Sequence, residues 1–427
     1  MTRSFRVAVV ASHPIQHFRP QYSSWAKLPD VDLTVFFASD HGVSAYRDPG
    51  FGRDVKWDGQ LDFPHEFLDD AAGKPVTHRI DAPDLGARLS HFSPDVVVAY
   101  GYSQKVQRRA VRWARSARVP VLMTSDSELR ASRTWPVRAT KAVVVPWLLK
   151  DVTFFLTVGD ANEAYYRHYG VSDDRFVRCS FPIDVRHYDS IMARRQCVRD
   201  RLRAELGLPA DHKVVLTVGK LVPRKRHADL VRFSNALQQH RDNVTVVIAG
   251  TGQEDDALRA LAARTGTGGV MFAGFVSPER LAEYYCAADV YVHCSADEPH
   301  SLAITEAVYT GLPVVVSDRC GSHGPTDDVQ PGVNGFVYRC GDVQDLSQRI
   351  MHILDDGDLH AHLSRASMRI GAAHQALAHG QGLLHALTRV QGAIDAGFRR
   401  SIRASITAVA AAGRRRWREA PQRARSN

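Results

Sequence analysis

The sequence lacks the cysteine and histidine spacings that mark metal-binding or redox motifs. It has six cysteines in 427 residues, and no two of them form a Cys-x-x-Cys pair or a zinc-finger spacing. It contains no His-Glu-x-x-His motif either. We therefore interpret the cysteines as buried thiols in a reducing compartment. We expect no metal and no other cofactor.

Long apolar runs are also missing. The longest candidate, residues 143–149, is short and is interrupted by Pro146, whereas a membrane-spanning helix needs about 20 apolar residues. The apolar stretch near the start stops at Ser12-His13, without the long apolar region and the cleavage site of a secretory signal. We expect a cytoplasmic protein whose N-terminus forms a buried strand.

Positive charge is scarce outside the C-terminal end. The net charge is +9, but residues 397–427 carry nine arginines against one acid, so eight of those charges lie there. The nearly neutral remainder argues against binding to nucleic acid. The apolar stretch 402–412 between arginines, and the amphipathic segment 135–150, indicate peripheral contact with an anionic membrane surface. A solvated, partly disordered tail is the alternative.

Short apolar runs alternate with amphipathic stretches along the whole chain. In the first half, strands are predicted at residues 7–11, 33–38, 95–99, 120–124 and 154–158, with a helix over 104–117. In the second half, strands are predicted at 213–218, 244–249, 270–273, 290–294 and 314–317, with helices over 228–240, 254–264, 278–287 and 302–309. Continuous apolar strands separated by helices indicate parallel sheets covered on both faces. The fold class is therefore α/β with two Rossmann-like domains.

The length of the chain favours two domains. We predict an N-terminal domain over 1–185, a charged, helical linker over 186–211, and a C-terminal domain over 212–370. A long helix over about 345–397 would cross back to the first domain with its part 371–396, followed by the basic tail 397–427. Ligands of such sheets bind beyond the carboxyl ends of the strands. We therefore expect a site in the cleft where the two domains face each other.

The densest chemical signal is a pair of acids, Glu298 and Glu306, after the strand at 290–294. Glu298 would lie in a loop and Glu306 in the following helix, with Ser301 as a plausible N-cap. The free backbone amides of residues 300–303 would bind phosphate at the helix N-terminus. Carboxylates suit sugar and ribose hydroxyls, because they accept two hydrogen bonds. Both acids could alternatively be solvated surface groups.

Two further signals follow the strands at 213–218 and 244–249. Gly219 allows a tight turn, after which Lys220 and Lys225 can supply countercharge to a nucleotide diphosphate. Gly250-Thr-Gly252 lacks the third glycine of the dinucleotide-binding fingerprint, so it does not indicate NAD. The acid pair Asp327-Asp328 is interpreted as loop acids.

Taken in order, these motifs over residues 213–340 resemble the donor-binding domain of the family-4 glycosyltransferases, which have the GT-B fold. Gly219-Lys-Leu with Lys225 resembles the phosphate motif of that family. Gly250-Thr-Gly resembles its glycine loop, the segments 272–276 and 284–292 resemble its Phe-x-Gly-Phe-Val and Tyr-x-x-Ala-Asp-Val motifs, and Glu298 with Glu306 resembles its acid pair.

The resemblance implies a role for each matching residue. Glu298 would contact the donor sugar, and Lys225 would bind the diphosphate, both as catalytic groups. Lys220 would also bind the diphosphate, and Glu306 would bind the ribose. The other donor-binding candidates are Gly219, Gly250, His300, Ser301, Leu302 and Ala303. The family retains anomeric configuration and typically needs no metal. This sequence departs from the family at Lys220, where Arg is usual, at His300-Ser301, where Phe-Gly is usual, and at residues 97–102, which lack a histidine.

The first half resembles a subset of the family more loosely. This resemblance rests on three segments: His13-Pro-x-Gln16, the acidic loop at Asp126, and the Pro-x-x-Asp segment that ends at Asp184. His13 and Asp126 are therefore candidate catalytic groups on the acceptor side. The predicted function is transfer of a sugar from a nucleotide-sugar donor to a glycan or lipid-linked acceptor. The alternatives are a sugar-nucleotide epimerase or phosphorylase on the same fold, and a catalytically dead sugar-binding scaffold.

Overall fold

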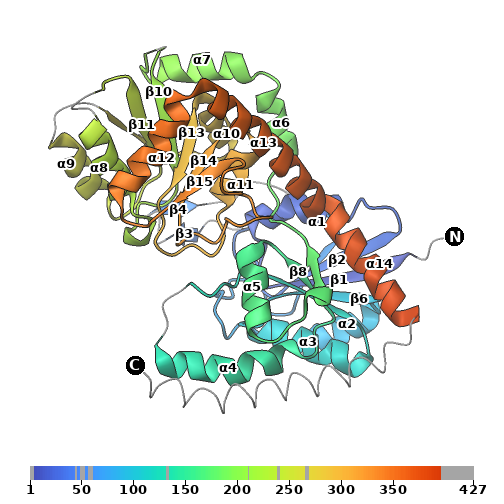
Figure 1. The fold of residues 1–427 in the computed structure, drawn as a ribbon. Helices are drawn as coiled ribbons and strands as arrows, with labels where there is room; N and C mark the ends of the chain where they lie inside the picture. Colours follow the sequence, from blue (N-terminus) through green and yellow to red (C-terminus); the bar gives the residue numbers. More distant parts are fainter. Residues whose placement is uncertain are drawn as a thin grey trace.

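The computed structural model shows two α/β halves, each built on its own parallel sheet (Figure 1). It describes residues 4–43, 46–48, 53–55, 61–130, 134–209, 211–237, 241–264 and 269–395. The basic tail and the stretch 402–412 lie outside the described residues, so their contact with a membrane stays a prediction. Within the described residues, no helix combines the length and apolar character needed to cross a membrane.

The N-terminal sheet has seven parallel strands in the order β5-β2-β1-β6-β7-β8-β9. Their bounds are β1 Phe5–Ala11, β2 Val31–Phe37, β5 His65–Phe67, β6 Val96–Tyr100, β7 Val121–Ser125, β8 Phe154–Thr157 and β9 Phe176–Arg178. The helices of this half are α1 Arg19–Trp25, α2 Leu85–Phe92, α3 Lys105–Ala117, α4 Trp135–Leu149 and α5 Asp160–His168, and a separate hairpin pairs β3 Tyr46–Asp48 with β4 Arg53–Val55. The central strands are buried on both faces, which is why they appear as continuous apolar runs.

The C-terminal sheet has six parallel strands in the order β12-β11-β10-β13-β14-β15. Their bounds are β10 Lys213–Val218, β11 Val244–Ala249, β12 Val270–Gly274, β13 Val290–His293, β14 Val314–Ser317 and β15 Gly335–Tyr338. Its helices are α8 His227–Leu237, α9 Asp255–Ala263, α10 Pro278–Ala287, α11 Leu302–Tyr309 and α12 Val343–Asp355. The strand order reverses between β10 and β13, and ligands of such sheets bind beside that point.

One helical prediction was confirmed and another was wrong in detail. The charged linker segment is helical as predicted, and it forms two helices, α6 Val185–Met192 and α7 Arg195–Glu205. The long helix predicted over 345–397 is divided into α12, α13 Gly357–Ala376, a π-helical turn over Leu377–Gln381, and α14 Gly382–Asp395. The edge strands β5, β9 and β15 were not predicted, because they are short and only partly buried and so lack the continuous apolar run of the central strands.

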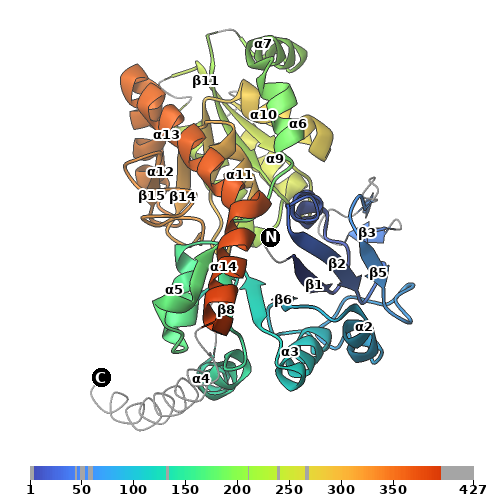
Figure 2. The ribbon, with the colours of Figure 1, turned by 90° about the vertical axis from the view of Figure 1, so that its right-hand side faces the viewer.

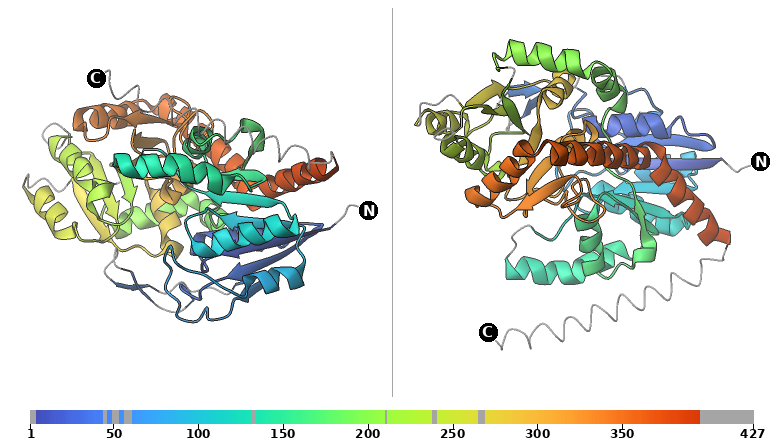
Figure 3. Two further views of the ribbon diagram at one scale, coloured as in Figure 1. Left: turned by 90° about the horizontal axis from the view of Figure 1, so that it is seen from below. Right: turned by 45° about the horizontal axis from the view of Figure 1, so that its top comes forward.

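The last helices join the two halves (Figures 2 and 3). The carbonyl oxygen of Ala378, in the π-helical turn, accepts hydrogen bonds from Gln21 Nε2 at 3.0 Å and from Trp25 Nε1 at 2.9 Å. Beyond this turn, Leu383 and Leu387 of α14 pack into the core of the N-terminal sheet. The limits of the domains predicted from the sequence stay predictions.

A second contact joins the halves beside α5. Asp327, in the loop after β14, accepts a hydrogen bond from the backbone amide of Asp160 at 2.6 Å. In return, the carboxylate of Asp160 accepts one from the amide of Thr326 at 2.8 Å. An acid of the C-terminal half thus caps the first turn of a helix in the N-terminal half, which holds the edges of the cleft together.

Candidate active site

The N-terminus of α11 lies at the centre of the candidate site. Ser301 occupies the N-cap position, but its side chain makes no capping hydrogen bond, and its backbone amide donates to Ser322 Oγ at 2.9 Å. The predictions of a capping side chain and of a free amide at Ser301 were therefore wrong. Leu302 and Ala303 occupy the first turn, where an α-helix leaves amides without intrahelical partners.

Glu298 lies just before this turn in a mostly buried position. Its carboxylate forms an ion pair with Lys225 and lies 3.4 Å from His293 Nε2. Ser295 Oγ donates to the same oxygen at 3.3 Å. Burial alone would raise the pKa of Glu298, but the His293 hydrogen bond and the charge of Lys225 lower it to about 2. The carboxylate is therefore ionised at neutral pH.

Glu306, one turn further into α11, has a different environment. Its carboxylate accepts a hydrogen bond from Tyr285 OH at 2.7 Å, and Tyr188 of α6 supplies a second phenol hydrogen bond. Burial raises the pKa of Glu306 to about 7, although the two phenols act in the opposite direction. The two glutamates thus differ in protonation, and a ligand that needs both ionised must select the ionised form of Glu306.

The two glycine-containing loops pack against each other. A Cβ atom on Gly250 would lie 1.8 Å from the carbonyl oxygen of Gly219, so no side chain fits there. The amide of Gly219 donates to Ala249 O at 3.0 Å and that of Gly250 to Gly274 O at 2.8 Å. These two amides thus already have backbone partners. The role of the two glycines is to allow the close packing that shapes the loop carrying the half-buried Lys220.

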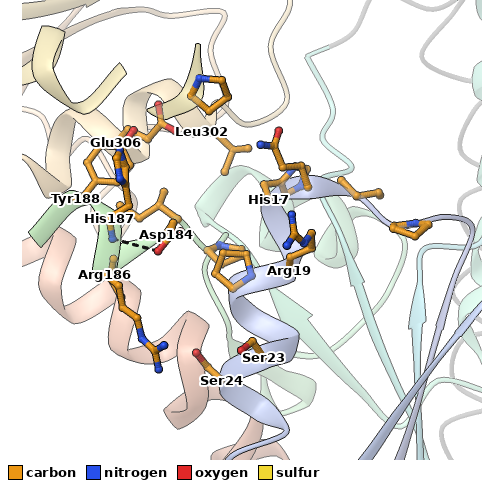
Figure 4. Close-up of a pocket in the computed structure, with 18 of the residues that line it drawn as sticks. His17, Arg19, Ser23, Ser24, Asp184, Arg186, His187, Tyr188, Leu302 and Glu306 are labelled. Carbon is orange, nitrogen blue, oxygen red and sulfur yellow. Dashed lines mark hydrogen bonds between the residues drawn. The ribbon is translucent and has the colours of Figure 1, made fainter. Parts of the chain in front are cut away.

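A cavity of about 810 Å³ lies between the halves and brings Glu306 opposite the loop that follows β1. Figure 4 shows Tyr188 and Glu306 on one side and His17 and Arg19 on the other, with Leu302 between them. His13 lines the same cavity. Burial, together with nearby His41, lowers the pKa of His13 to about 4, so this ring is neutral at pH 7.

A second cavity of about 530 Å³ is lined by Asp126 and Lys141 from the N-terminal half and by Arg224, Glu298 and His300 from the other half. Burial raises the pKa of Asp126. The predicted site residues are therefore divided between two cavities. Glu306 and His13 line the first, whereas Glu298, His300 and Asp126 line the second.

Asp328 is a residue of this site that the sequence analysis took for an ordinary loop acid. It is buried, its Oδ2 atom lies 3.3 Å from His300 Nε2, and its Oδ1 atom lies 2.8 Å from His374 Nδ1. Burial alone would lower the pKa of His300, but the hydrogen bond to Asp328 and its charge raise it. Among the described residues, none forms a hydrogen bond to His300 Nδ1, so this nitrogen remains available to a ligand.

His300, Asp327 and Asp328 are also close enough to share a metal ion, since their ligand atoms lie within 4.8 Å of one another. Asp327 already accepts the amides of Asp160 and of Asp328. Asp328 is engaged by two histidines and by Thr305. We interpret the group as a hydrogen-bonded network, and the expectation that no metal is needed stays a prediction.

Comparison with known proteins identifies the C-terminal half. Residues 198–369 match the family model described as glycosyl transferases group 1. We refer to these residues, which match that family model, as the group 1 domain. The chain is 35% identical over 163 residues to the lipopolysaccharide core biosynthesis glycosyltransferase LpsE of Rhizobium meliloti, and 37% identical over 178 residues to a D-inositol 3-phosphate glycosyltransferase of Acidothermus cellulolyticus.

These alignments cover part of each protein. They span 38% and 39% of this chain, and 45% and 39% of the two relatives. The chain thus matches less than half the length of these curated relatives. The group 1 domain contains Lys220, Lys225, Glu298 and Glu306, so it holds the predicted donor side of the site.

Solved structures extend the likeness to the whole fold. The complex of HepE from Anabaena with UDP has a TM-score of 0.66 at 20% identity, over 90% of this chain and 100% of that one. A glycosyltransferase from Rickettsia africae has a TM-score of 0.67 at 12% identity, over 91% and 99%. The predicted GT-B fold, with two Rossmann-like domains, is thereby confirmed.

Proposed function

We propose that this protein transfers a sugar from a nucleotide-sugar donor to a glycan or lipid-linked acceptor, with retention of anomeric configuration and without a metal ion. One observation carries the proposal. Within the group 1 domain, the first turn of α11 lies between the Lys225–Glu298 ion pair and Glu306. Phosphate-binding amides thus lie between Glu298, which lines the second cavity, and Glu306, which lines the first, with the cation of Lys225 beside Glu298.

The donor would lie along this turn. The amides of Leu302 and Ala303, with Lys220 and Lys225, would hold the diphosphate, while Glu306 binds the ribose hydroxyls. When the bond between the anomeric carbon and the phosphate oxygen breaks, its electron pair passes to the diphosphate. Fixed cations and amides at that position stabilise the developing charge. Glu298, kept ionised by its partners, would accept hydrogen bonds from the sugar.

The acceptor would approach from the N-terminal half. His13 is neutral at pH 7, since its pKa is lowered to about 4, and can therefore both donate and accept hydrogen bonds. Asp126 lines the same cavity as Glu298, which supports a role for it beside the donor sugar. We assign these two residues to acceptor hydroxyls.

The proposal is tested by turnover with a panel of nucleotide sugars, starting with UDP-glucose because UDP and UDP-glucose are bound in the HepE structures. Released nucleoside diphosphate is measured with and without sugar and lipid-linked acceptors, in the presence of a chelator. NMR of the product gives the anomeric configuration. We expect release that depends on the acceptor, resists the chelator and is lost in Glu298→Gln but kept in the exposed control Glu205→Gln.

Two results would contradict this proposal. Isomerisation of the donor in the absence of an acceptor would indicate an epimerase. A strict requirement for inorganic phosphate would indicate a phosphorylase.

A further inference from the structure

The loop between β1 and α1 carries a histidine whose ring has no partner within the protein. His17 lies in a short 3-10 turn over Gln16–Phe18 that leads into α1. The protein encloses the ring, but the first cavity still reaches it. Among the residues that the structure describes, none forms a hydrogen bond with either ring nitrogen. Enclosed polar groups normally have such a partner, so His17 is a candidate for contact with a ligand.

Aromatic packing fixes the position of this ring. Phe18 is buried in the core of the N-terminal sheet, and its ring centre lies 4.4 Å from that of His17. Phe181, in the segment between β9 and α6, has its ring centre 5.8 Å from that of His17 and 4.9 Å from that of His300. One phenylalanine thus packs against a histidine of each half. A side chain held in this way loses little entropy when it binds a ligand.

The His17 ring lies close to the first turn of α11. Both His17 and Leu302 line the first cavity, and Figure 4 shows Leu302 between His17 and Glu306. Leu302 also packs against the core cluster of the N-terminal half that contains Phe18 and Phe181. An anion bound by the amides at this helix N-terminus would therefore lie within reach of the histidine ring.

The surroundings of His17 favour donation of a hydrogen bond over acceptance of a proton. Burial lowers the pKa of His17 to about 4, and the nearby His13 and His300 act in the same direction. The ring is therefore neutral at pH 7, with one N–H donor and one acceptor nitrogen. Because a base of such low pKa is a poor proton acceptor at neutral pH, the N–H is the useful group. Its strongest partner is an anionic oxygen.

We propose that His17 binds the diphosphate of the donor from the N-terminal half, through a hydrogen bond that its ring N–H donates to a phosphate oxygen. This inference rests on the proposed function. The amides of Leu302 and Ala303 bind the same group from the C-terminal half. The diphosphate subsite is therefore complete only while the two halves are in contact.

The test compares UDP, GDP, TDP and ADP with their nucleosides, because only the diphosphates carry the group that His17 binds. Affinities are measured by calorimetry for the diphosphates and by NMR titration for the nucleosides. His17→Phe keeps a ring against Phe18 and Phe181 but has no N–H. We expect it to bind the preferred diphosphate at least about tenfold more weakly than the wild type, and the nucleoside equally well. His91→Phe, which changes an exposed histidine that lines neither cavity, should match the wild type.

A second variant and a second measurement guard against misfolding of His17→Phe. His17→Gln keeps an N–H donor, so it should retain more of the diphosphate affinity than His17→Phe. In wild-type protein with ¹⁵N-labelled histidine, the diphosphate should shift the ring signals of His17, which are assigned by their loss in His17→Gln. The nucleoside should leave these signals in place. Thermal unfolding shows which variants are folded.

Three results would overturn the inference and leave the proposed function intact. The first is equal diphosphate affinity of wild type and folded His17→Phe, with ring signals that the diphosphate does not shift. The second is equal weakening of diphosphate and nucleoside binding, which would assign a packing role to His17. The third is unchanged diphosphate affinity with loss of turnover, which would place His17 at the acceptor. If the wild type binds none of the four diphosphates, the proposed function itself fails, and this inference fails with it.

Discussion

The ammonium of Lys225 and the carboxylate of Glu298 form an ion pair in which both side chains are nearly buried, at 12% and 10% exposure. One comes from the loop after β10 and the other from the loop after β13, so the pair joins two strand ends that are neighbours in the sheet. Loss of one partner would leave the other charge buried and uncompensated. The proposed sugar-binding and phosphate-binding groups thus depend on each other.

Glu298 should stabilise the fold above its unfolded pKa. Its pKa is lowered from 4.5 to about 2 in the folded protein, so the stability it contributes is present above about pH 4.5 and is lost as the pH falls toward 2. Glu298→Gln should remove this part of the acid dependence, which amounts to about 1–3 kcal/mol of the free energy of unfolding. Urea unfolding of wild type and variant between these pH values measures it. Parallel pH curves for the two proteins would show that Glu298 does not carry the effect.

Glu306 should change the stability with pH in the opposite direction. Burial raises its pKa from 4.5 to about 7, so the folded state holds a proton that the unfolded state releases. Stability therefore falls as the pH rises from 4.5 through 7. In Glu306→Gln, which is uncharged at every pH, this component should be absent. Urea unfolding of wild type and variant at pH 5 and pH 7.5 provides the comparison. If the free energy of unfolding changes between these pH values by the same amount in both proteins, the prediction is wrong.

His300 should act as a cation in turnover. The hydrogen bond to Asp328 raises its pKa, and the charges of Asp327 and Asp126 act in the same direction. His300→Gln should lower kcat by roughly 10–100-fold, because a fixed cationic donor in the cavity that also contains Glu298 is lost. In the wild type, kcat should fall as the pH rises through the pKa of His300.

Asp328→Asn provides the second arm of this prediction. Without the carboxylate, the pKa of His300 falls, so the descending limb of kcat should move to lower pH. Thermal unfolding of Asp328→Asn shows whether the variant folds, since Asp328 also contacts His374. A descending limb at an unchanged pH in folded protein would exclude His300 as its source.

Gly250→Ala should disrupt the donor loop. The added Cβ would lie 1.8 Å from the carbonyl oxygen of Gly219, so one of the two loops must move. We expect a loss of more than about 2 kcal/mol in stability together with weaker nucleotide binding. Gly392→Ala is the matched control, because a Cβ there meets nothing within 4 Å. If both variants bind nucleotide like the wild type, the loop contact is not required.

The sequence predicted the elements that periodicity and strong motifs determine. The bounds of β10, β11, β14, α10 and α11 agree with the structure residue for residue, because continuous apolar strands, and helices bounded by serine, proline or glycine, have distinct local patterns. The division of the helix over 345–397 could not be predicted in the same way. The π-helical turn there is held by Gln21 and Trp25 of α1, and this contact joins segments more than 350 residues apart.

The site was predicted unevenly for a similar reason. Glu298, Glu306 and Lys225 belong to one ordered set of motifs in the group 1 domain. Asp328 lies 28 residues from His300 in the chain, and only the fold of the loop after β14 brings the two together. A buried acid in a loop of ordinary composition carries no local signal.

The most direct test of the account is calorimetric titration of the wild type, Lys225→Ala and Glu306→Ala with UDP, GDP, TDP and ADP, without metal. The account predicts micromolar binding of one nucleotide by the wild type, and a loss of at least about 100-fold in each variant. The exposed control Glu205→Gln, which lines neither cavity, should bind normally. If folded wild-type protein binds none of the four nucleotides, the assignment of the donor site is contradicted.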